Sequence, residues 1–261
     1  MSDFDERIKN LDLTLFDKIE SQSVPEDRES LLACQFAVRE LRSEYNYLEI
    51  GSYLGGSIQP YLPDDRCKRI YSIDKRPSRQ PDERGVDYQY LNNSTARMLE
   101  LLREAAPGKT DKITTIDGDS GTIDPAQISE KIQLCFIDGE HTDEAASRDF
   151  RFCLDVLDEN GLIVFHDAAV TYNGIADCIE FLKKREIRFR AYNLPTIVFA
   201  IEIGDFPVHK SPPVLERLLN NHVGYLFSLQ SNDQYRQFTN KAPFKLYRRF
   251  MTWRKGLNKF E

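Results

Sequence analysis

The sequence lacks several patterns that would assign it to a familiar class at once. None of its five cysteines lies in a C-x-x-C pair, which argues against a zinc framework or a paired redox site. No apolar run approaches the ~20 residues of a membrane-spanning helix. The acidic opening MSDFDERIKN is unlike the basic start of a secretory signal. We therefore expect a cytoplasmic protein whose thiols are reduced and buried.

Acidic residues outnumber basic ones over most of the chain, and an excess of positive charge is confined to one end. The net charge of −7 argues against a nucleic-acid-binding protein. Residues 241–261 contain seven lysines and arginines against Glu261 alone, which gives this basic tail +6 and leaves −13 for the other 240 residues. Apolar side chains between Phe244 and Trp253 alternate with these cations. The basic tail can form a peripheral membrane contact or a contact between copies of the chain, or pack on its own domain.

Short apolar runs alternate with helical patterns through the middle of the chain. The runs YNYLEI, RIYSI, KITTI, QLCFI and GLIVF predict strands, whereas residues 25–45, 94–106 and 142–157 have apolar side chains at helical spacing. Asn160 and Gly161 are expected to close the last of these helices. Strands that alternate with helices indicate βαβ units and a mostly parallel sheet with helices on both faces.

Two further runs, RFRAYNL and TIVFAIEI, are separated only by a few residues around Pro195. So short a connection predicts a hairpin, and hence one antiparallel strand at the end of the sheet. We therefore predict a Rossmann-like, doubly wound α/β fold with a seven-stranded sheet. This domain spans residues 46–204, between a helical N-terminal segment, 1–45, and a C-terminal extension, 205–261, that ends in the basic tail.

The stretch LEIGSYLGGS, residues 48–57, is rich in glycine but has neither common phosphate-binding pattern. The second glycine of G-x-G-x-x-G is missing, and no lysine follows the last glycine as in G-x-x-x-x-G-K-[ST]. Glu49 instead indicates a ligand that carries positive charge nearby. The plainer alternative is a turn with a solvated acid at the end of the strand.

Acidic, hydroxyl or imidazole groups follow nearly every predicted strand. They are Glu49, Asp74, Asp119 with Ser120, Asp138 with Glu140, and His166 with Asp167. Ligands of open α/β sheets bind at the carboxyl ends of the strands. One strand-end aspartate is more often a helix cap, but five groups in succession indicate a site. Asp74 is placed to accept hydrogen bonds from ribose hydroxyls, and Asp119 with Ser120 can contact the amine of an adenine.

The combination LEIGSYLGGS, YSID, GDS, FIDGEHTDEAASRDF and GLIVFHDA resembles class I S-adenosylmethionine-dependent methyltransferases. It is most similar to the subgroup that contains metal-dependent O-methyltransferases of small molecules, over about residues 45–203. The resemblance implies an enzyme that transfers a methyl group from S-adenosylmethionine to a hydroxyl of a small molecule or sugar. An alternative is a non-catalytic scaffold or membrane-associated protein with the same fold; the missing glycine disfavours a dehydrogenase.

The resemblance also implies a role for each of these residues. The cofactor contacts would be Glu49, Gly51, Tyr53, Gly55, Ser57, Asp74, Asp119, Ser120 and Asp138. A divalent metal, Mg²⁺ or Mn²⁺, would be held by Asp138, His166 and Asp167, although the imidazole stands where an oxygen ligand is usual and suits Mn²⁺ better. Glu140 or His141 would accept the proton of the hydroxyl, and without a metal His141 would be the base. The alternative is that Glu140 and His141 have no catalytic role and are only an acid and a surface histidine at the start of a helix.

Overall fold

The computed structural model of the chain describes residues 3–85, 87–222, 226, 230, 233–234, 237–238 and 240–254. The chain divides into two compact units, Met1–Leu219 and Asn220–Glu261. The expected boundaries near residues 45 and 204 both fall inside the first unit. The N-terminal segment belongs to this unit because Phe4 and Ile8 are buried in a core cluster that also contains residues of the central sheet.

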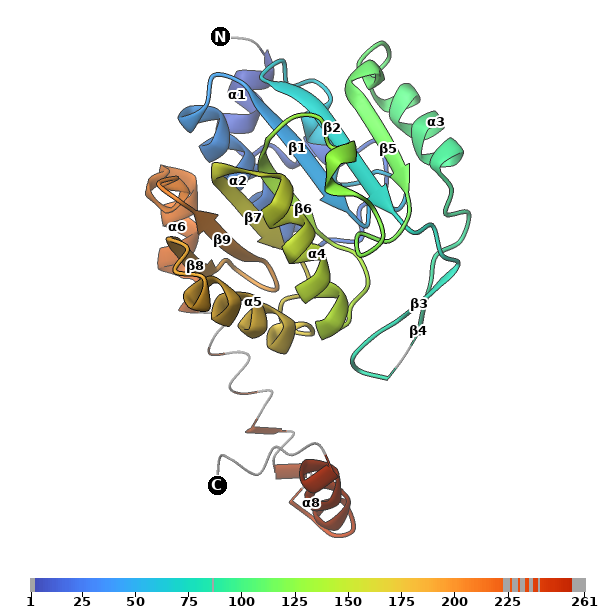
Figure 1. Cartoon of the computed structure of the whole chain (residues 1–261), viewed down its shortest axis with the longest axis vertical. Helices are drawn as coiled ribbons and strands as arrows, with labels where there is room; N and C mark the ends of the chain where they lie inside the picture. The colour runs from blue at the N-terminus through green and yellow to red at the C-terminus, as the bar shows by residue number, and fades with distance from the viewer. Residues whose placement is uncertain are drawn as a thin grey trace. The chain divides into compact units, whose positions relative to one another are not determined.

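A seven-stranded sheet forms the centre of the first unit, in the order β5-β2-β1-β6-β7-β9-β8 (Figure 1). Its strands are β1 (Tyr45–Ile50), β2 (Cys67–Asp74), β5 (Ile113–Asp117), β6 (Ile132–Ile137), β7 (Leu157–Phe165), β8 (Phe189–Asn193) and β9 (Phe199–Ile203). The strands from β5 to β7 in this order pair in parallel, and β9 runs antiparallel to both β7 and β8. The predicted fold class, including the terminal hairpin, is confirmed.

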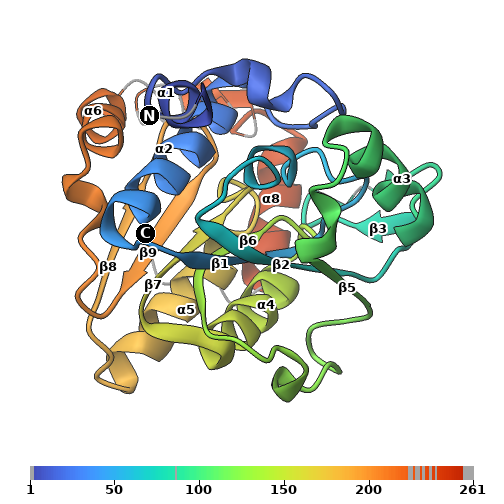
Figure 2. The same ribbon diagram turned by 90° about the horizontal axis from the view of Figure 1, so that it is seen from above.

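Helices cover both faces of the sheet, with α4 and α5 on one side and α1, α2 and α6 on the other (Figure 2). The helices of this unit are α1 (Asp3–Lys9), α2 (Pro25–Leu41), α3 (Thr95–Ala105), α4 (Asp143–Val156), α5 (Tyr172–Lys184) and α6 (Pro212–Asn220). One core cluster lies on each face. Alternate residues of β1 enter different clusters, Tyr47 the first and Leu48 the second, as the two-residue period of a strand requires. Glu49 consequently points to the same face as Tyr47.

The junction between α4 and β7 differs from the expectation that Asn160 and Gly161 close the helix. The helix ends at Val156, and Leu157 has extended backbone and pairs with Ile132 of β6. Leu157 is also buried, so entering the sheet at this residue removes an apolar side chain from water. Asn160 and Gly161 therefore lie within β7.

A second, two-stranded sheet was not expected from the sequence. It is a hairpin of β3 (Arg79–Pro81) and β4 (Asp87–Gln89), which pair antiparallel. Each strand has only three residues, and neither shows the apolar alternation by which a strand is recognised. Short 3₁₀ helices occur at Leu13–Phe16, Gln59–Tyr61, Thr110–Lys112, Pro125–Gln127 and Val208–Lys210.

The described part of the second unit contains α8 (Phe244–Arg254); the basic tail beyond Arg254 lies outside the described residues. None of the helices in the described ranges combines the length and the apolar character needed to cross a membrane. All five cysteines of the chain are buried, which confirms the prediction of buried thiols.

Candidate functional site

The turn after β1 brings the ends of two neighbouring strands into direct backbone contact. Gly51 has a φ of +94°, and a Cβ atom at this position would lie 2.0 Å from the carbonyl oxygen of Asp138, at the end of β6. A side chain here would force the two turns apart and would strain the backbone. The glycine predicted from the sequence is therefore required by the geometry of this edge.

Glu49 is fully buried in β1, just before this turn. Its carboxyl group accepts hydrogen bonds from the hydroxyls of Tyr47 (2.5 Å) and Ser57 (2.6 Å). Burial, together with the charges of Asp138 and Asp74, raises the pKa of Glu49 to about 8, although the hydrogen bonds from the two hydroxyls lower it. A cation bound beside Glu49 would favour its charged form.

Asp74, at the end of β2, ties the glycine loop to the neighbouring strand. Its carboxylate accepts hydrogen bonds from the backbone N–H groups of Tyr53 (2.8 Å) and Arg76 (2.6 Å). Gly55 lies further along the same loop, against the side chain of Leu102 in α3. The loop is thus held from two sides at the carboxyl edge of the sheet.

Lys75 links two acids that follow different strands. Its ammonium group lies 2.8 Å from Asp119 and 3.1 Å from Glu140. Arg148 of α4 also lies 3.0 Å from Asp119, and the charges of these cations contribute to a lowered pKa of Asp119, against the effect of burial. Glu140, a predicted base, is therefore ion-paired on the side of the sheet that holds the predicted adenosine contacts.

Next to Lys75 is a small cavity of about 20 Å³, lined in part by Asp74, Ser120 and Glu140. Ser120 donates a hydrogen bond to the buried Asp149, so its hydroxyl already has a protein partner. The structure brings these predicted adenosine contacts together, with the side chain of Lys75 among them.

A larger cavity of about 450 Å³ opens on the other side of the glycine turn. The glycine loop with Gly51 and Ser57, the N-terminal segment 20–24, Asp138, His141 and Asp167 contribute to its lining. A wider and more open cavity of about 750 Å³ lies along α4, but Asp138, His141 and Asp167 do not line it. The 450 Å³ cavity is therefore the candidate active site.

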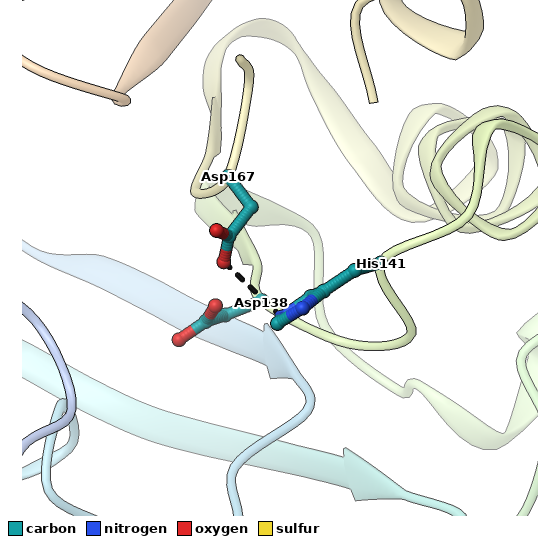
Figure 3. Close-up of side chains that lie close together, drawn as sticks. All are labelled: Asp138, His141 and Asp167. Atoms are coloured by element: carbon teal, nitrogen blue, oxygen red, sulfur yellow. Dashed lines mark ion pairs between the residues drawn. The ribbon is translucent and has the colours of Figure 1, made fainter. Parts of the chain in front are cut away.

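Three side chains of types that can bind a metal lie close together (Figure 3), and all three line this cavity. Asp138, His141 and Asp167 each offer one ligand atom, and these atoms all lie within 4.8 Å of one another. The Nε2 atom of His141 is 3.1 Å from a carboxylate oxygen of Asp167. Two carboxylates and one imidazole form a donor set that suits Mn²⁺ or another transition metal better than Mg²⁺.

His166, the histidine predicted as a ligand, is enclosed by carboxylates on both sides. Its Nδ1 atom lies 2.8 Å from Asp167 and 3.1 Å from Asp138, and its Nε2 atom lies 3.3 Å from Asp27. Burial lowers the pKa of His166, but the charge of Asp138 and the hydrogen bonds to these carboxylates together raise it well above its usual value. The group whose ligand atoms all lie within 4.8 Å of one another contains His141 and not His166, so the geometry favours His141 as the third ligand.

Two buried acids in contact with these histidines were not predicted as site residues. Asp27 lies in the first turn of α2 and contacts His166, but its position in the sequence indicates only an acid near the start of a helix. Asp82 follows β3 and lies 3.3 Å from Nδ1 of His141. Because its hairpin has no apolar pattern, no sequence signal pointed to Asp82.

Comparisons with known proteins agree with this fold. Residues 48–168 match a family model described as a methyltransferase domain, and this range runs from β1 to just beyond Asp167. No curated protein sequence matches the chain.

Among solved structures, the cofactor-bound Rv0187 from MTB is similar at 14% identity with a TM-score of 0.52, over 75% of this chain and 88% of that one. The calicheamicin methyltransferase CalS11 is similar at 15% identity with a TM-score of 0.51, over 77% of this chain and 92% of that one. At these identities the likeness concerns the fold.

Glu49 should make the stability of the protein depend on pH. Its pKa of about 8 in the folded state exceeds the ordinary value of about 4.3 in the unfolded chain. The folded state therefore binds the extra proton between these values, and the free energy of unfolding falls as the pH rises from about 4 to about 8, by up to ~1.4 kcal/mol per pH unit.

Urea denaturation at about pH 5 and about pH 8 measures this effect. Between these pH values Glu49 binds more protons in the folded state than in the unfolded chain. We expect Glu49→Gln to remove most of the loss of stability, whereas Glu44→Gln, at an exposed carboxylate, should behave as the wild type. An identical pH dependence in all three proteins would show that Glu49 is already ionised in the folded state.

Proposed function

We propose that this chain, a methyltransferase by the domain it contains, takes its methyl group from S-adenosylmethionine and transfers it to a hydroxyl of a small molecule. The observation that carries the proposal is the convergence of Asp138, His141 and Asp167 on the 450 Å³ cavity beside the glycine turn. Such a cavity has the size and the few convergent polar groups of a small-molecule site.

The residues at the edge of the sheet fit such a cofactor. Gly51 allows close approach of the loop, and the carboxylates of Glu49 and Asp138 complement a sulfonium and an ammonium group. Asp74 and Ser120 would hold the adenosine part, where Lys75 has to move because the present cavity measures only about 20 Å³. When bound, S-adenosylmethionine supplies a methyl group on a positively charged sulfur.

The residues on the acceptor side are placed to orient a hydroxyl and remove its proton. The Nε2 atom of His141 lies among the side chains that line the cavity and can accept that proton. Asp138, His141 and Asp167 would hold a divalent ion, which when bound lowers the pKa of a coordinated hydroxyl. A nitrogen bound to a metal has no lone pair left for a proton, and Glu140 is paired with Lys75, so His141 is proposed as the base for the metal-free form of the site.

Binding of S-adenosylhomocysteine tests the cofactor proposal without an acceptor. We expect the wild type to bind it and not NAD in calorimetry. Asp74→Ala removes an acceptor of charge-assisted bonds, each worth roughly 1.5–3 kcal/mol, so affinity should fall at least about tenfold. Asp65→Ala, at a carboxylate whose side chain is 86% exposed, is the control. Binding of NAD instead, or no effect of Asp74→Ala, would contradict the proposed site.

Binding of Mn²⁺, followed by electron paramagnetic resonance, tests the proposed metal ligands directly. We expect one site that Asp138→Asn, Asp167→Asn and His141→Gln each weaken by at least about tenfold. The exposed Asp177 provides the control Asp177→Asn. Retention of the site in His141→Gln with loss in His166→Gln would restore the ligand set predicted from the sequence, and an absence of binding would leave a metal-free site with His141 as base.

We also propose that the basic tail binds anionic lipid surfaces through α8. Phe244, Tyr247, Phe250 and Trp253 of this helix are exposed. At 100° per residue the cations Lys245 and Arg249 fall on the opposite face, whereas Arg254, in the last turn, falls on the aromatic side. Aromatic side chains on one face and cations on the other are typical of helices that lie in a membrane interface.

Sedimentation with phospholipid vesicles tests this role of α8. We expect the full chain to sediment with anionic vesicles but not with neutral ones, and a chain that ends at Ala242 to remain in the supernatant. Lys245→Glu with Arg249→Glu should abolish binding through charge, and Phe250→Ser with Trp253→Ser through lost apolar burial. Equal, negligible sedimentation of all these proteins would contradict the proposal.

A further inference from the structure

The β3–β4 hairpin is joined to the turn that carries His141. Asp82 and His141 form a parallel bridge of the backbone, and the N–H group of Glu83 donates to the carbonyl oxygen of His141 at 2.9 Å. The carboxylate of Glu83 in turn accepts from the backbone N–H of Asp143, at the start of α4, at 3.0 Å. The backbone around His141 is therefore held by a hairpin that begins more than fifty residues earlier.

The side chain of Asp82 is completely buried at this junction. Arg84 donates to both of its carboxylate oxygens, at 2.8 and 2.7 Å, and so compensates its charge. The oxygen that accepts the second of these bonds also lies 3.3 Å from Nδ1 of His141. A carboxylate can only accept hydrogen bonds, so a hydrogen bond to Asp82 requires a proton on Nδ1 of His141; the 3.1 Å contact of Nε2 with Asp167 would require a proton on Nε2 as well, unless a bound cation or substrate takes the place of that contact.

The opposite side of the imidazole is thereby directed to the cavity. With Nδ1 turned to Asp82, the Nε2 atom lies 3.1 Å from Asp167. The ring of Tyr88, from β4, packs edge to face against the ring of His141 with centroids 5.4 Å apart, and Arg84 lies over the ring of Tyr88. The hairpin thus fixes both the plane of the imidazole and the nitrogen that faces the candidate active site.

We propose that Asp82 is a positioning residue for His141: it holds the imidazole so that Nε2, and not Nδ1, meets the acceptor hydroxyl or a bound ion. The proposal rests on the proposed function, since it assigns His141 a part in methyl transfer. Buried carboxylates that accept from one nitrogen of a functional imidazole commonly fix its tautomer and orientation. On this proposal the β3–β4 hairpin contributes a residue that supports the active site.

The ring nitrogens of His141 report this role directly through their ¹⁵N resonances in the histidine-labelled full chain. A His141→Gln variant identifies the signals among the four histidines. In the wild type we expect Nδ1 to show the resonance of a protonated, hydrogen-bonded nitrogen. Asp82→Ala should move it toward the unprotonated position, and Asp82→Asn should move it less because the amide oxygen still accepts.

Asp87→Asn is the matched control, because it removes the ion pair of Asp87 with Arg79 in the same hairpin without touching His141. It should leave the ring resonances unchanged. Unchanged resonances in Asp82→Ala would overturn the proposal, as would an equal change in Asp87→Asn, which would indicate general loosening of the hairpin. Failure of the wild type to bind S-adenosylhomocysteine would contradict the proposed function but would leave the ring measurement valid.

Discussion

The backbone contact between the turns after β1 and β6 is the constraint on which the site depends. Because residue 51 has no side chain, its loop can approach the carbonyl of Asp138 more closely than any other residue would allow. The contact sets Glu49, on β1, and Asp138, after β6, on either side of one turn. The cavity beside this turn, with Asp167 from the next strand, follows from the parallel order β1-β6-β7.

The electrostatics of the cavity follow from that convergence. Asp27, Asp138 and Asp167 surround His166; burial lowers its pKa, but their charges and hydrogen bonds raise it well above the usual value. Carboxylates gathered in this way repel one another unless a positive charge joins them. A sulfonium cofactor or a divalent ion would complement the negative charge that remains at this cavity, which both His141 and His166 line.

The sequence was sufficient to predict the sheet and the acids at its edge. Strands such as YNYLEI and QLCFI are short and apolar, and parallel strands end at one edge, so the sequence alone predicts a common site for Asp74, Asp138 and Asp167. The terminal hairpin followed from the few residues around Pro195.

The surroundings of the two histidines could not be predicted, because both rings line the cavity and nothing in the local sequence shows which carboxylates each ring contacts. Those carboxylates include Asp27, 139 residues away from His166, and Asp82 in a polar hairpin without periodicity. Such contacts depend on tertiary packing, which short-range patterns do not encode.

A crystal structure of the full chain with S-adenosylhomocysteine would test the account most directly. The account predicts the ribose beside Asp74, the displaced side chain of Lys75 at the adenine, and the sulfur facing the cavity lined by Asp138, His141 and Asp167. A ligand bound elsewhere on the chain, or one that leaves this edge of the sheet unchanged, would contradict the proposed active site.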